Sequence, residues 1–236
     1  MTGHLDHAIV VAGHAVLKHF RDPLLDENWS LLDFQKGEGP CYAGHVRCGV
    51  ETAAADPRSL LLFAGTQSRA EAGPRSEAQS CLWIAQHYEW FGAPEVAARA
   101  VTEEFSRDSF ENLLFGICRF KEFTGAYPSR VSFVSWNFKE GRIELHREAI
   151  RWPKERFRYV GANNPPEIAQ ALAAEASTRA SYIADPYSGT PALRAKRDSR
   201  NLFRLQHGYF TSCPELAGLF RHTGPQLYEG DLPWTI

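Results

Sequence analysis

Residues 103–112 combine many of the side chains that catalysis and ligand binding use. Within these ten residues the sequence has four carboxylates, one guanidinium, two hydroxyls and one amide, provided by Glu103, Glu104, Asp108, Glu111, Arg107, Ser106, Ser109 and Asn112. A carboxylate whose pKa is raised by burial can act as a general base, so Glu104, Asp108 and Glu111 are the candidate catalytic carboxylates. His146 is the candidate general acid, and Arg107 is suited to bidentate contact with a phosphate.

A simpler interpretation of the same residues stays open. Asp108 and Glu111 have the spacing of a helix capping box, so both side chains could do no more than accept hydrogen bonds from backbone N–H groups. Arg107 could merely neutralise the carboxylates around it. His146 lies in a helical pattern, where a histidine is more often structural than catalytic.

The apolar pattern predicts the elements that must position this stretch. Short apolar runs predict strands near residues 7–14, 60–65, 97–102, 130–136 and 157–161. Helical patterns alternate with them, near residues 41–55, 76–91, 110–120, 141–151 and 165–183. This alternation indicates a doubly wound α/β domain over residues 1–184, with a mostly parallel, Rossmann-like sheet of about five core strands.

The pattern loosens after residue 184. Proline and glycine interrupt residues 185–236 repeatedly, but the many aromatic side chains argue against disorder. We expect an irregular C-terminal extension that packs on the same domain, with short helices starting at Asp198 and Cys213.

In doubly wound folds, ligands bind outside the carboxyl ends of the strands, where helix N-termini also gather. The segments that follow the predicted strands should therefore meet there. They supply these candidate ligand-binding residues: Gly13, His14, Gly65, Thr66, Gln67, Arg69, Ser76, Glu77, Arg107, Ser109, Asn112, Trp136 and Arg147. We expect Gly13, Gly65 and the helix N-termini at Ser76 and Asp108 to hold an anion through backbone N–H groups.

Composition excludes several classes of function. The net charge is −2, with 26 basic and 28 acidic residues interspersed, so we expect no nucleic-acid partner. No run approaches the ~20 apolar residues of a membrane helix, and the N-terminus has no signal-peptide pattern. Five scattered cysteines are typical of free thiols in a reducing compartment, which predicts a cytoplasmic protein. No histidine pair has a partner at a zinc spacing, so no structural zinc is expected, although Glu104, Asp108 and Glu111 could take a divalent ion.

The order of these motifs resembles the YdcF, SanA and ElyC family, a family with a domain of unknown function. The matching segments are Ala12-Gly13-His14, Ala64-Gly65-Thr66, Ser76-Glu77-Ala78, Glu103 to Asn112 and Leu145-His146-Arg147. The resemblance covers about residues 7–160 and implies a nucleotide-type ligand such as S-adenosylmethionine, or phosphate chemistry. The turns after the first two predicted strands contain fewer glycines than the family pattern, since His14 follows Gly13 and Thr66 follows Gly65.

Two functions follow as hypotheses. The first is a hydrolase or transferase acting on a phosphate-containing or nucleotide-like small molecule. The alternative is a non-catalytic protein that binds such a ligand, or a protein partner, with the same pocket. The hypotheses differ in one geometric expectation, because catalysis requires Glu104 or Glu111 to approach the same cavity as His146.

Overall fold

A five-stranded parallel sheet forms the centre of the protein. The computed structural model describes residues 4–235, so the expectation of a missing signal peptide concerns in part Met1–Gly3, which lie outside the described residues. The strands are β1 (His7–Ala12), β4 (Ser59–Ala64), β5 (Ala100–Glu103), β6 (Arg130–Ser135) and β7 (Phe157–Gly161), in the order β5-β4-β1-β6-β7. All four pairings are parallel. The strand order reverses on either side of β1, which confirms the predicted doubly wound topology.

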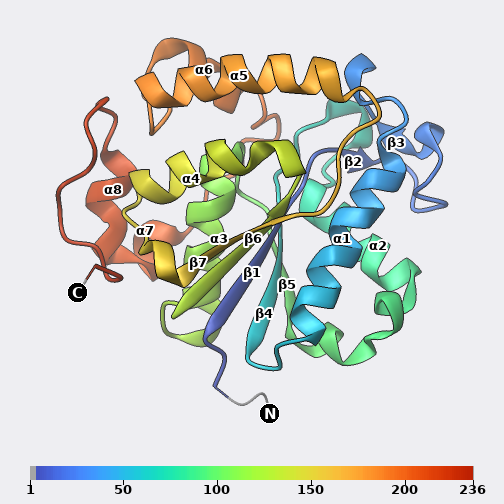
Figure 1. Ribbon diagram of the computed structural model, residues 1–236, viewed down its shortest axis with the longest axis horizontal. Helices are drawn as coiled ribbons and strands as arrows, with labels where there is room; N and C mark the ends of the chain where they lie inside the picture. Colours follow the sequence, from blue (N-terminus) through green and yellow to red (C-terminus); the bar gives the residue numbers. More distant parts are fainter. Residues whose placement is uncertain (1–3, 236) are drawn as a thin grey trace.

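Helices cover both faces of this sheet (Figure 1). On one face α1 (Gly39–Ala54) and α2 (Glu77–His87) pack, and on the other α3 (Ser109–Thr124) and α4 (Glu140–Ala149). A longer helix, α5 (Ile168–Ala184), crosses over α4 (Figure 1). The capping box predicted at Ser76 and Gln79 is present at the start of α2.

Strand β1 is fully buried because two helices press on its opposite faces. Successive strand residues point to opposite sides of a sheet, so Val10 faces α3 and Val11 faces α1. Each valine meets a helix glycine: a Cβ on Gly116 would lie 2.6 Å from Val10 Cγ2, and a Cβ on Gly49 would collide with Val11 Cγ2. Glycine at these two positions therefore lets both helices approach the sheet more closely than any larger residue would allow.

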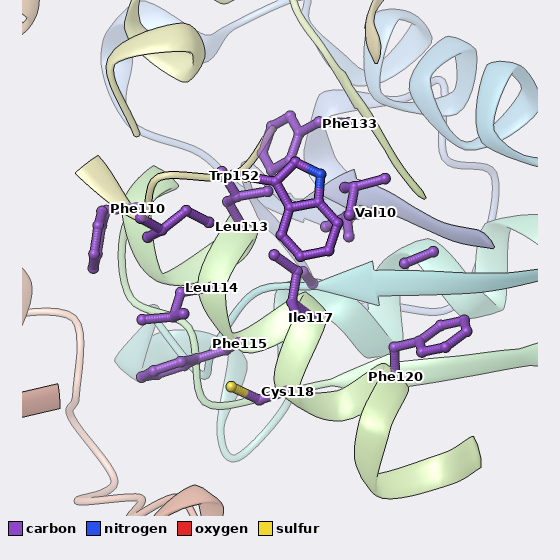
Figure 2. Packing of buried hydrophobic residues seen from close by; sticks show 14 of the residues in the cluster. Val10, Phe110, Leu113, Leu114, Phe115, Ile117, Cys118, Phe120, Phe133 and Trp152 are labelled. Carbon is purple, nitrogen blue, oxygen red and sulfur yellow. The ribbon is translucent and has the colours of Figure 1, made fainter. Parts of the chain in front are cut away.

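The core on the α3 side contains most of the large aromatic side chains. Figure 2 shows Val10, Phe133 and Trp152 above the apolar face of α3, whose Leu113 and Ile117 are fully buried. This face explains why the helix after Asp108 could be predicted, since its apolar residues recur at helical spacing.

Shorter elements complete the chain. Two of them, β2 (Val16–Leu17) and β3 (Trp29–Ser30), form a small antiparallel ladder that the sequence pattern did not predict. The 3₁₀ helices are Asp26–Asn28, Asp33–Gln35, Ala70–Ala72, Glu89–Gly92, Pro94–Arg99, Asn137–Lys139, Lys154–Arg156 and Pro214–Leu216.

The C-terminal extension packs on the α3 side of the sheet. It contains α6 (Pro191–Asp198), α7 (Tyr209–Ser212) and α8 (Ala217–Arg221). Tyr209 and Cys213 are fully buried in the same core as α3. The prediction of a helix start at Asp198 is wrong, because Pro191 occupies the first turn of α6 and Asp198 is its last residue.

Two further observations concern the described residues as a whole. None of their helices is long and apolar enough to cross a membrane. All five cysteines are free thiols.

Candidate functional site

A cavity of about 360 Å³ opens at the carboxyl edge of the sheet. Its volume is at the lower end of the range for small-molecule sites, which is about 300–1,000 Å³. The segments after β1 and β6, the start of α3, one side of α5 and the end of α6 form its walls. This is where the ligand of a doubly wound fold is expected.

The N-terminus of α3 borders the cavity. Asp108 is the N-cap residue, and its Oδ1 accepts a hydrogen bond from the N–H of Glu111 over 2.9 Å. Within residues 4–235 the N–H groups of Ser109 and Phe110 donate to no acceptor, so the positive end of the helix stays available. Asn112 lines the cavity one turn later, and its buried Oδ1 has no partner among the described residues.

Three arginines around the cavity form ion pairs with buried carboxylates. Arg107 pairs with Glu111 at 2.6 Å, Arg197 with Asp108 at 2.7 Å, and Arg142 with Glu175 at 2.9 Å. The charge of Arg197 is the main attraction that holds the pKa of Asp108 well below its usual range, against the opposing effect of burial. Asp108 is consequently ionised, and Arg197 already balances its charge.

Four other cationic residues line the cavity with no carboxylate within ion-pair distance among the described residues. They are Arg69, Lys139, Lys196 and Arg200. Burial, followed by the charge of Arg142, lowers the pKa of Lys139 to about 7. Burial and the charge of Arg200 lower the pKa of Lys196 too. Arg200 thus lies close enough to both lysines to repel them, and a bound anion would relieve that repulsion.

The glycine turns after β1 and β4 do not offer their N–H groups to a ligand. The N–H of Gly13 donates to the carbonyl of Ala64 over 2.7 Å, and that of Gly65 to the carbonyl of Glu103 over 3.0 Å. The first N–H groups of α2 are used in the same way, since those of Glu77 and Ala78 donate to carbonyls of the turn after β4. The expectation that Gly13, Gly65 and the helix start at Ser76 hold an anion by backbone N–H groups is therefore not met.

The side chain of Glu77 occupies the space beside these two glycines. A Cβ on Gly13 would lie 2.5 Å from Glu77 Cβ, and one on Gly65 would lie 2.7 Å from Glu77 Oε2. Gly65 also has a φ of +148°, which other residues rarely adopt. Both glycines are needed for the approach of Glu77, whose carboxylate accepts a hydrogen bond from Ser68.

Aromatic side chains form another part of the cavity wall, and Lys139 lies over one of them, with 5.7 Å between its Nζ and the ring centroid of Phe138. The ring of His14 stacks on Trp136 with 5.6 Å between the centroids, and Phe34 and Phe138 extend this wall to the rim. Burial and the charge of Lys139 lower the pKa of His14 well below its usual value, so its imidazole is neutral. Such a wall suits a flat, uncharged group such as a nucleobase.

His146 lies behind Ser109 rather than in the cavity. Its Nε2 is 2.8 Å from Ser109 Oγ, and its buried Nδ1 has no partner among the described residues. An orphaned buried N–H is rarer than an orphaned acceptor, so we infer that Nε2 carries the hydrogen and donates to Ser109. Ser109 then retains its own hydrogen for donation into the cavity. Burial lowers the pKa of His146 to about 3, which leaves it a poor general acid.

The structure brings nine of the predicted site residues to the cavity: Gly13, His14, Arg69, Glu77, Arg107, Asp108, Ser109, Asn112 and Trp136. Eight do not line it: Glu104, Glu111, His146, Gly65, Thr66, Gln67, Ser76 and Arg147. Both carboxylate oxygens of Glu111 bind Arg107, and Glu104 accepts from Thr102 instead. Arg147 bonds to Glu144 and to the carbonyl of Trp152. The shared cavity required for the predicted acid–base groups is thus not formed by Glu104, Glu111 and His146.

Sequence reasoning missed most of the cationic residues at the site. Lys139 and Arg142 follow β6, Lys196 and Arg197 are in the last turn of α6, and Arg200 lies just after that helix. The basic residues at 194, 196, 197 and 200 were an available signal, because they fall within two helical turns. Proline and glycine interrupt the extension so often that no helix is predicted across these basic residues.

Metal binding receives no support from the described residues. Within residues 4–235 no three His, Cys, Asp or Glu side chains are grouped so that they could hold a metal ion. Asp108 and Glu111, two of the residues proposed for a divalent ion, are bound to arginines.

Comparison with known proteins gives one distant relative. The chain is 25% identical to the uncharacterized protein YOR238W of Saccharomyces cerevisiae over 205 aligned residues, and the match covers 67% of each chain. No family model matches the chain, and no solved structure matches it. At this identity the relative assigns neither a family nor an activity, so function must be argued from the cavity itself.

Proposed function

We propose that this is a cytoplasmic YdcF-like protein that binds a phosphate-containing, nucleotide-type small molecule in the cavity at the carboxyl edge of the sheet. The observation that carries the proposal is a set of cations beside the N-terminus of α3 that have no carboxylate within ion-pair distance in residues 4–235, namely Arg69, Lys139, Lys196 and Arg200. Cations and helix N-termini both stabilise bound phosphate. Phe34 and Phe138, the more exposed of the aromatic residues in the cavity wall, give a nucleobase a surface on which to stack.

An enzymatic role, as a hydrolase or transferase, fits one feature of the cavity. Lys139 has a pKa of about 7 and lines the cavity, so it can give or take a proton near neutral pH. In this scheme Lys139 replaces Glu104, Glu111 and His146 as the acid–base group, and Ser109 donates a hydrogen bond to the phosphate.

The second candidate function is ligand binding without catalysis. It is favoured by the positions of Glu111 and His146, both buried and bonded away from the cavity. The same ligand chemistry applies to both candidates.

Thermal unfolding with and without ligand tests the binding proposal. Inorganic phosphate, adenosine mono- and diphosphate and S-adenosylmethionine are the probes, and native mass spectrometry identifies any retained compound. We expect a phosphate compound to raise the melting temperature of the wild type, and Lys139→Gln to weaken that shift. Lys154→Gln is the control, because Lys154 is exposed at the opposite edge of the sheet. Absence of a shift with every probe would overturn the proposal.

A panel of phosphoesters separates the two candidates. Turnover that is lost in Lys139→Gln and kept in Lys154→Gln supports an enzyme. Saturable binding without turnover supports the non-catalytic alternative.

A further inference from the structure

We infer that the cavity holds two linked phosphate groups, and that Lys196 and Arg200 of the C-terminal extension bind the second of them together with Lys139. This inference rests on the proposed function and specifies its substrate class as a diphosphate ester. It also gives the extension a direct role in binding, although the predicted ligand-binding residues all came from the first 184 residues.

The first phosphate position is defined by the start of α3. Ser109 lines the cavity there, and it offers a hydroxyl and a backbone N–H that has no acceptor within residues 4–235. Asn112 has a buried polar atom without a partner at the same place, and only 7% of this residue is exposed. Because the atom without a partner is the acceptor Oδ1, Asn112 can accept a hydrogen bond from a ligand hydroxyl through Oδ1 and donate one to an oxyanion through its amino group.

Arg200 connects this position to the second one. One of its guanidinium N–H groups donates to the carbonyl of Arg107 over 2.8 Å, directly before the N-cap of α3. The remaining N–H groups of Arg200 form no hydrogen bond within the described residues, and the residue lines the cavity. It can therefore contact a phosphate at the helix start and its neighbour at the same time.

The charges at the second position decide between one phosphate and two. A single phosphate ester carries about −1.5 to −2 at neutral pH. Lys139, Lys196 and Arg200 bring up to three positive charges with no carboxylate within ion-pair distance among residues 4–235, since Glu175 is bound to Arg142 and Asp108 to Arg197. One phosphate would leave part of this charge unbalanced, whereas a diphosphate ester, at roughly −3, matches it.

Binding of matched mono- and diphosphates tests the inference. Isothermal titration without divalent ions compares inorganic phosphate with pyrophosphate, and adenosine monophosphate with adenosine diphosphate. We expect each diphosphate to bind at least about tenfold more tightly than its monophosphate, the value of one additional charge-assisted hydrogen bond. Equal affinities would overturn the inference while leaving the proposed function in place. Failure of all four compounds to bind would overturn the proposed function itself.

Substitutions assign the second position to the extension. Lys196→Gln and Arg200→Gln should each weaken diphosphate binding about tenfold, and Lys196→Gln should change monophosphate binding less than about twofold. Arg194→Gln is the matched control, because Arg194 is an exposed cation of α6 that does not line the cavity. Within residues 4–235 the side chain of Lys196 forms no ion pair, so its substitution leaves no buried carboxylate without a partner and does not threaten folding. An equal loss in Arg194→Gln, or equal losses for both ligand types in Lys196→Gln, would refute the assignment.

Discussion

Arg197 Nε lies 2.7 Å from Asp108 Oδ2, and this ion pair fastens the C-terminal extension to the N-cap of α3. Both side chains are largely buried, with 13% and 8% of their surface exposed. Arg197 is also 3.3 Å from Glu111, so one guanidinium serves two carboxylates at the start of the same helix. The extension is consequently part of the structure that shapes the cavity.

Removing this arginine should destabilise the protein more than removing both partners. Arg197→Met leaves Asp108 buried without its cation, and we expect the free energy of unfolding in urea to fall by about 3 kcal/mol. The double variant Arg197→Met, Asp108→Asn removes the charge that would be stranded and should recover part of this loss. Arg194→Met on the same helix is the control. Equal stability of Arg197→Met and Arg194→Met would show that the pair contributes nothing.

The same pair should make stability sensitive to acid. The pKa of Asp108 is lower in the folded protein than its unfolded value of about 3.9. Its contribution is therefore complete above the unfolded pKa and is lost as the pH falls through the folded pKa. The stability difference between wild type and Asp108→Asn should be constant above about pH 5 and shrink below about pH 4. A difference that does not change with pH would contradict the assignment.

Lys139 should also make stability rise with pH, but on the alkaline side. Its pKa is lowered from 10.5 to about 7, chiefly by burial and by Arg142, with Arg200 adding to the decrease and Glu175 and Glu38 opposing it. Between these values the unfolded chain binds more protons, so stability should rise with pH from about 7 to 10. Lys139→Met should remove this rise when compared with wild type by urea unfolding at each pH. Identical pH profiles for the two proteins would contradict the shifted pKa.

The contact between Gly116 and Val10 gives a test of packing. Gly116→Ala places a methyl group 2.6 Å from Val10 Cγ2, and overpacking of this kind costs about 1–3 kcal/mol. Val10→Ala opens space for that methyl group, so the double variant should be more stable than the sum of the two single changes implies. Gly208→Ala, where a Cβ meets nothing within 4 Å, should leave the unfolding midpoint almost unchanged. Simple additivity would argue against direct contact.

His146 should remain neutral across the physiological range. Its pKa of about 3 and its hydrogen bond to Ser109 predict a neutral imidazole with the proton on Nε2 from pH 8 down to about pH 4. Nitrogen-15 NMR distinguishes the two tautomers and the charged form directly. A titration near the ordinary value of about 6.5, or a proton on Nδ1, would contradict the orientation assigned to Ser109.

The sequence was informative where local pattern determines structure. The continuous apolar runs of β1 and β4 are typical of strands buried on both faces, and Asp108 is an N-cap because its carboxylate reaches the N–H three residues later. The positions of Arg107, Ser109 and Asn112 beside the cavity followed from that helix start.

Other features depend on contacts between distant segments. The helical pattern around His146 specifies which face is buried, but not that the imidazole binds Ser109 instead of facing a ligand. Lys196 and Arg200 reach the cavity only because the core around Tyr209 places the extension against α3. No local pattern encodes that placement.

The side chain of Glu77 competes with any bound anion for the space beside the turns after β1 and β4. Its side chain fills the hollow beside Gly13 and Gly65, and Ser68 holds its carboxylate there. The Glu77 carboxylate is attached to the chain, so its effective concentration in this space is on the order of millimolar. A phosphate from solution would have to displace it. An anion must therefore bind at α3 and the extension instead of at the glycine turns. A smaller residue in place of Glu77 would open space beside Gly13 and Gly65.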